Sequence, residues 1–152
     1  MRIMNVAMES KLQDFVFFRG MEAAHLRLVA DCCSEVVFEE GQIIFLAGEP
    51  ANQFYLIQSG LVAVESRRPD GRTAQIETVP EGEVLGWSWL FPPFAWHFQA
   101  RALAPTRAIK INGARLLVAA EANPQFGYRL MKQVARVAIH RLDAARQRLG
   151  TL

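Results

Sequence analysis

The sequence predicts one mainly β domain, a sandwich or barrel, with helices on either side of it in the chain. Three observations support this. Short runs of β-branched and aromatic residues recur at near-regular spacing with glycine-rich turns between them. Helical periodicity precedes these runs and returns after Asn112. At 152 residues, about half of them apolar, the chain can bury a core of its own.

The first predicted element is a helix over residues 21–33. Leu26, Val29 and Ala30 recur in it at helical spacing. We expect His25, on the same helix, to lie at the surface. No apolar run approaches the roughly 20 residues of a membrane span, and the N-terminus has no secretory layout. A cytoplasmic protein without membrane contact is therefore expected.

Two cysteines follow each other directly in the sequence, Cys32 and Cys33. A disulfide between neighbours would close a strained ring, so we expect free, buried or half-buried thiols. Together with three scattered histidines they give no spacing typical of a metal site. The sequence therefore predicts no metal.

Seven β-type runs follow Ser34. They cover residues 36–38, 43–45, 54–57, 61–64, 74–79, 84–85 and 108–111. Ser59-Gly60 separates two runs so tightly that we expect a two-residue hairpin turn, with the glycine at positive φ. Pro69-Asp70-Gly71 predicts a second hairpin.

The last quarter of the chain predicts two helices. Asn112 can cap a short helix through about Glu121. Asn123 and Pro124 begin a long one, with asparagine at the N-cap and proline at the first helical position. This helix should run to about Leu149 and end at Gly150.

The long helix carries two apolar stripes. The first suits packing against the β domain: Phe126, Leu130, Val134 and Val137. The second alternates four and three apart like a coiled-coil seam: Met131, Ala135, Ala138, Leu142, Ala145 and Leu149. A narrow seam with small residues suits a second copy of the same helix, which predicts a homodimer. The alternative is that both sets of residues belong to one broad apolar stripe that packs into the core of the same chain. The helix is also basic, which indicates either a solvated face or an anionic partner.

Aromatic residues are concentrated in residues 82–102. All three tryptophans lie here, and half of the twelve residues from Trp87 to Phe98 are aromatic, against a tenth of the whole chain. Such density beside Pro92-Pro93 and the lone His97 predicts either a plug of core or the lining of a pocket.

At this point the chain resembles the cyclic nucleotide-binding domain family, as in bacterial regulators of the catabolite-activator type. The resemblance rests on glycines at matching intervals, above all residues 41–50 followed by residues 55–60. It implies an eight-stranded, jelly-roll-like β-roll with an N-terminal helix and two C-terminal helices. It divides the single domain, residues 1–152, into an N-terminal helix plus β-roll at about 18–111 and C-terminal helices at 112–150.

In that family the segment matching residues 82–102 is the phosphate-binding cassette. The family has a glutamate that accepts a hydrogen bond from the ribose 2′-OH and a short helix whose N–H groups face the phosphate. An arginine followed by serine or threonine neutralises and hydrogen-bonds the phosphate. Here Trp87 follows Gly86, and Trp96-His97 or His97-Phe98 stands in the place of the arginine pair. The resemblance leaves His97 and Arg101 as the only nearby cations. The pocket candidates that follow from this comparison are Gly86, Trp87, Ser88, Trp89, Trp96, His97, Phe98 and Arg101.

These observations favour a stand-alone regulatory sensor that does not bind cAMP or cGMP in the usual way, and they predict no bound cofactor. Three alternatives stay open: an interaction or dimerisation module without ligand, an atypical cyclic nucleotide binder using His97 and Arg101, and haem binding through His97. No catalytic constellation stands out, so we expect no enzyme. Because the chain stops at Leu152, no recognition helix follows, and sequence-specific DNA binding is not expected. Regulation would then act through the dimer or a separate effector protein.

Overall fold

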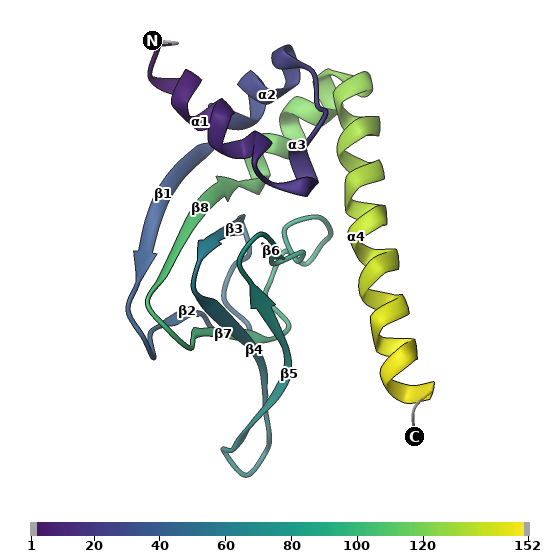
Figure 1. Cartoon of the computed structure of the whole chain (residues 1–152). Coiled ribbons are helices and arrows are strands. Elements are labelled where there is room, and N and C mark those ends of the chain that lie inside the picture. Colours follow the sequence, from purple (N-terminus) through teal and green to yellow (C-terminus); the bar gives the residue numbers. More distant parts are fainter. Residues whose placement is uncertain (1–2, 151–152) are drawn as a thin grey trace.

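Three short helical elements open the chain in a computed structural model that describes residues 3–150 (Figure 1). They are α1 (Ile3–Gln13), the 3₁₀ turn η1 (Val16–Phe18) and α2 (Ala23–Ala30). The sequence pattern did not predict α1. Among its residues from Val6 onward, Leu12 is fully buried, whereas Val6 is 62% exposed, so they form no clear inward stripe. The predicted helix over residues 21–33 is shorter than expected, since Cys33 already begins a strand.

Eight strands form two antiparallel four-stranded sheets, which confirms the β-roll. Their order is β1-β8-β3-β6 in one sheet and β2-β7-β4-β5 in the other. The strands are β1 (Cys33–Phe38), β2 (Ile43–Phe45), β3 (Gln53–Ser59), β4 (Leu61–Arg67), β5 (Thr73–Pro80), β6 (Val84–Leu85), β7 (Gln99–Ala102) and β8 (Thr106–Asn112).

Strand β7 is the one that the residue pattern did not show. Its sequence, Gln-Ala-Arg-Ala, has no β-branched residue. It becomes a strand through pairing on both edges, with β2 at Ile43↔Arg101 and with β4 at Val62↔Ala102. Its two alanines are buried, so the strand leaves room for larger side chains in the roll.

The two predicted hairpins have different outcomes. Residues 69–71 do join a hairpin, β4 to β5, and Gly71 has φ +86°. The predicted Ser59-Gly60 hairpin is wrong, because β3 and β4 belong to different sheets. Gly60 takes the chain across from one sheet to the other at φ +104°, and a Cβ there would lie 2.7 Å from the Pro105 carbonyl oxygen.

Two apolar clusters make up the core. One joins the helices to the outer side of the first sheet and includes Phe18, Phe54 and Trp89. The other fills the roll between the sheets and includes Tyr55 and Trp96. Cys32 and Cys33 are free and half-buried beside the first cluster, as expected. Burial raises the pKa of the Cys33 thiol to about 12, so it stays protonated.

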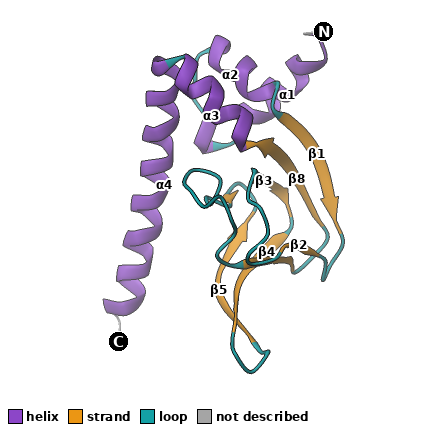
Figure 2. Cartoon of the chain, turned by 180° about the vertical axis from the view of Figure 1, so that it is seen from behind, coloured by secondary structure: helices purple, strands orange, loops and turns teal. Residues whose placement is uncertain are grey.

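The C-terminal helices are α3 (Gly113–Ala122) and α4 (Pro124–Gly150). The predicted caps are present: Asn112 Oδ1 accepts from the backbone N–H of Arg115 at 3.0 Å, and Asn123 Oδ1 accepts from that of Phe126 at 3.2 Å. Helix α4 packs on the other helices through its first turns and then runs beside the roll (Figures 1 and 2).

The expectation of a surface position for His25 is wrong. The side chain is buried, with its ring 5.3 Å from that of Phe126 on α4 and its Nε2 3.2 Å from the Glu22 carboxylate. Docking of α4 on α2 covers it, and the periodicity of α2 alone could not show this.

Candidate functional site

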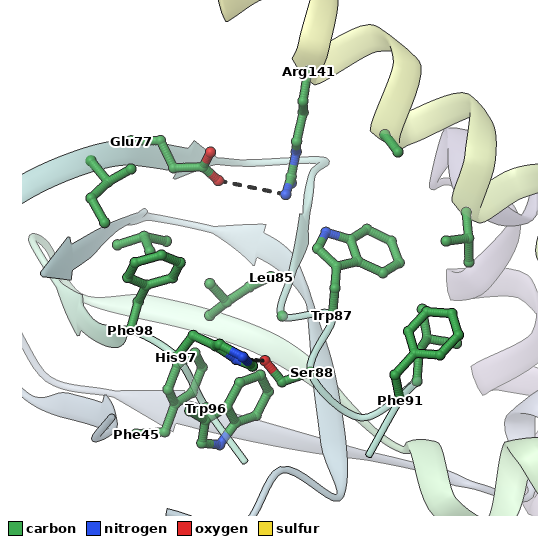
Figure 3. Close-up of a pocket in the computed structure, with 16 residues that line it drawn as sticks. Phe45, Glu77, Leu85, Trp87, Ser88, Phe91, Trp96, His97, Phe98 and Arg141 are labelled. Atoms are coloured by element: carbon green, nitrogen blue, oxygen red, sulfur yellow. Dashed lines mark hydrogen bonds and ion pairs between the residues drawn. The ribbon is translucent and has the colours of Figure 1, made fainter. Parts of the chain in front are cut away.

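A pocket of about 520 Å³ lies between the mouth of the roll, the segment joining β6 to β7, and α4 (Figure 3). Most of its wall is apolar. The roll contributes Phe45, Val64, Ile76 and Leu85; the β6–β7 segment contributes Gly86, Trp87, Leu90, Phe91, Trp96 and Phe98; and α4 contributes Val134 and Ala138. Its polar side chains are Glu77, Ser88, His97 and Arg141.

Six of the eight predicted pocket residues line this space. They are Gly86, Trp87, Ser88, Trp96, His97 and Phe98. The other two, Trp89 and Arg101, make contacts elsewhere in the domain. Whether the six bind a ligand stays a prediction.

Trp89 is part of the core. It is 1% exposed and stacks on Phe54 with ring centroids 4.5 Å apart. Its indole N–H donates to the carbonyl oxygen of Gly86 at 3.1 Å. The ring lies so close to Gly113 that a Cβ on this glycine would be 2.6 Å from Trp89 Cε3. Trp89 therefore anchors the β6–β7 segment against the start of α3.

Trp96 has an intermediate role. It is 5% exposed and stacks face to face on Phe45 at 3.8 Å, so it fills the roll while one part of it forms the pocket floor. Phe91 and Phe98 are 72% and 44% exposed. Some aromatic residues of the segment therefore fill the core and others line the pocket. The sequence pattern had presented these as two alternatives for the whole segment.

Arg101 forms an ion pair on β7. Its guanidinium donates to both carboxylate oxygens of Glu65 on β4, and the amide of Gln99 donates to the same carboxylate at 2.8 Å. Glu65 is almost fully buried, and the Arg101 hydrogen bond holds its pKa below the usual range. Val64, the neighbour of Glu65, lines the pocket, so by strand alternation the pair lies on the opposite face of the sheet.

Arg141 and Glu77 are the charged pocket residues that the sequence pattern did not single out. Arg141 extends from α4 to three groups of the roll: a nitrogen lies 3.5 Å from Glu77 Oε1, another donates to the Val84 carbonyl oxygen, and the guanidinium carbon is 5.8 Å from the Trp87 ring centroid. Arg141 lies four residues after Val137, which belongs to the apolar stripe predicted to pack against the β domain. This spacing was the sequence signal that could have placed Arg141 on the face toward the roll.

Ser88 and His97 form the polar end of the pocket. The hydroxyl oxygen lies 3.4 Å from His97 Nδ1 (Figure 3). Residues 86–98, in which the family has its short phosphate-binding helix, contain turns and bends and no helix. The described backbone of this segment therefore presents no helix N-terminus to an anion.

A profile of the cyclic nucleotide-binding domain matches residues 35–123, more than half of the chain. The chain belongs to this family of regulatory β-roll domains. It is 26% identical over 119 residues to the "CRP-like cAMP-activated global transcriptional regulator" of Mycobacterium tuberculosis, an alignment covering 78% of this chain and 53% of that protein. The chain thus spans about half the length of the curated relatives that it matches first.

Solved structures give the same fold. A Geobacter metallireducens protein, described provisionally as cyclic nucleotide-binding, superimposes with a TM-score of 0.80 at 30% identity, covering 88% of this chain and 97% of that one. The sensor domain of the transcriptional regulator DNR from Pseudomonas aeruginosa gives 0.74 at 20% identity, covering 94% and 95%. In residues 3–150 no helix is long and apolar enough to cross a membrane, and no cluster of three metal-ligating side chains occurs.

Proposed function

We propose that this domain is a regulatory sensor whose pocket takes a small molecule that is not a cyclic nucleotide held in the family's usual way. The observation that carries the proposal is the combination of an open apolar pocket with cations that are already paired. Arg141 lies against Glu77, and Arg101 is bonded to Glu65. A phosphate in the pocket would therefore lack the free arginine that compensates its charge in the family.

Helix α4 would relay occupancy of the pocket. Val134, Ala138 and Arg141 belong both to the pocket wall and to this helix. A ligand shifts an equilibrium between two states by the difference in its affinity for them. A ligand that contacts these three side chains would therefore stabilise α4 docked on the roll relative to α4 displaced from it. Membership in a family of regulatory domains supports a non-enzymatic role. An effector protein and a cytoplasmic location stay predictions.

Calorimetric titration of nucleotide-free protein tests the proposal. We expect no micromolar binding of cAMP, cGMP or a cyclic dinucleotide, because a buried phosphate would compete with Glu77 for Arg141. Micromolar binding of any of the three would contradict the proposal. The variants Arg141→Gln and Arg101→Gln would then show which cation had been recruited.

A second candidate function is self-association through α4. The seam residues Met131, Leu142 and Leu149 are 38%, 50% and 68% exposed, and Ala135 is exposed between them. Ala138 also lines the pocket and Ala145 is half-buried, so these two lie at the side of the seam nearer the roll. The exposed apolar members at coiled-coil spacing favour a second copy of the helix. The proposed homodimer does not exclude a pocket ligand.

Size-exclusion chromatography with light scattering tests the seam. We expect wild-type protein at micromolar concentration to have about twice the chain mass of 17.1 kDa. Leu142→Lys should give the monomer, because it places a charge in an apolar contact. Val118→Lys is the matched control, since Val118 is 68% exposed on α3 and lies outside the seam. A monomeric wild type would rule out the seam.

A further inference from the structure

We infer that the ligand of the pocket is a flat, neutral aromatic molecule carrying one hydroxyl or carbonyl group. The inference rests on the proposed function, because it names the chemical class that the same pocket would take. Three features of the wall support it: its aromatic faces, its balanced charge and its single polar end.

Aromatic side chains surround the cavity. Trp87, Phe91 and Phe98 line it from one segment (Figure 3), and the last two are 72% and 44% exposed. Trp96, stacked on Phe45, adds a fixed ring at the floor. Aromatic rings prefer offset-stacked or edge-to-face partners, so a planar ring system matches this wall better than a saturated molecule of equal size. A cavity of about 520 Å³ accommodates a compound of drug-like size.

Charge in the pocket is balanced before any ligand enters. Among its lining residues Glu77 and Arg141 carry the permanent charges, and they lie 3.5 Å apart. Arg141 also donates to the Val84 carbonyl oxygen and faces the Trp87 ring. An anion would have to separate this pair or remain uncompensated against a mostly apolar wall, and either costs free energy. The wall therefore favours a neutral ligand.

The remaining polarity is concentrated at Ser88 and His97. Their side chains lie 3.4 Å apart, between Trp96 and Trp87 in the close-up (Figure 3). The Ser88 hydroxyl can both donate and accept, and the His97 ring adds a second polar group beside it, which together match one hydroxyl or carbonyl group of a ligand. Outside the Glu77–Arg141 pair, the other polar side-chain groups among the lining residues are the indole N–H groups of Trp87 and Trp96, which only donate. Ser88 and His97 are therefore where the wall offers an acceptor together with a donor.

Calorimetry with four probes of similar size tests the inference: 2-naphthol, naphthalene, decahydro-2-naphthol and 2-naphthyl phosphate. We expect 2-naphthol to bind about tenfold more tightly than each of the other three, which lack the hydroxyl, the flat ring or the neutral charge. Trp87→Leu should weaken 2-naphthol about tenfold while keeping an apolar wall. Ser88→Ala together with His97→Leu should remove the preference for 2-naphthol over naphthalene.

The contrary outcomes are distinct. Tighter binding of 2-naphthyl phosphate, or no binding of any ring compound at about 1 mM, would overturn the ligand class and leave the proposed sensor role standing. Micromolar binding of cAMP, in the separate nucleotide titration described above, would overturn the sensor proposal itself. The variant Ile139→Ala, on α4 but outside both the pocket wall and the seam, should leave all four affinities unchanged.

Discussion

Replacing Trp89 with alanine is expected to lower the free energy of unfolding by about 3–5 kcal/mol, as for other buried aromatic side chains. The side chain is 1% exposed, stacks on Phe54 and donates to the Gly86 carbonyl oxygen. Its removal would leave a cavity between the β6–β7 segment and α3. Urea denaturation followed by far-UV circular dichroism measures the loss as a lower midpoint at unchanged slope.

Phe91→Ala is the matched control for Trp89→Ala. Phe91 comes from the same segment but is 72% exposed, so its truncation should change stability by less than about 0.5 kcal/mol. Trp89→Phe should lie in between, since it keeps a ring against Phe54 and loses the indole N–H. Equal effects of Trp89→Ala and Phe91→Ala would show that Trp89 is not an anchor of this segment.

Glu65→Gln is expected to cost about 2 kcal/mol at neutral pH, because the charge-assisted hydrogen bonds from Arg101 and the bond from Gln99 end on a buried carboxylate. The pKa of this carboxyl is lowered in the folded state. Its contribution is therefore fully present above the unfolded-state pKa, near 4.5, and is lost as the pH falls through the lower folded-state value.

Denaturation of both proteins from pH 7 down to acid pH measures this effect. The gap between wild type and Glu65→Gln should be constant above about pH 5 and should shrink below pH 4.5. Glu35→Gln is the control: its salt bridge to Lys11, at 2.8 Å, is exposed and should be worth less than about 1 kcal/mol. A gap for Glu65→Gln that widened as the pH fell would contradict the sign of the pKa shift.

The sequence alone predicted most of the β-roll, since its strands carry β-branched residues and its turns carry glycine. It failed at β7, where two alanines give no local signal and pairing on both sides decides the structure. It also failed at Gly60, because a two-residue connection looks the same whether the chain reverses within a sheet or crosses between sheets.

The candidate site was predictable as a segment and not as individual side chains. Trp87 and Trp89 are two residues apart, yet one lines the pocket and the other is in the core, because the segment has no regular period from which to assign faces. Arg101 looked available because Glu65, its partner, is 36 residues away in the sequence. Arg141 was counted only as one charge of a basic helix.

Helix α4 is unevenly held along its length. Its buried side chains, Phe126, Leu130 and Gln133, all lie in its first ten residues, and residues 134–150 are half-buried or exposed. In this second part Arg141 bonds to Glu77 and to the Val84 carbonyl oxygen. The second half of the helix should therefore open locally far more often than the first, so that its amide hydrogens exchange quickly with solvent while those near Leu130 are protected. The pocket lies at the boundary between the two halves. A bound molecule would move that boundary toward the C-terminus, and the length of α4 that resists exchange would record whether the pocket is filled.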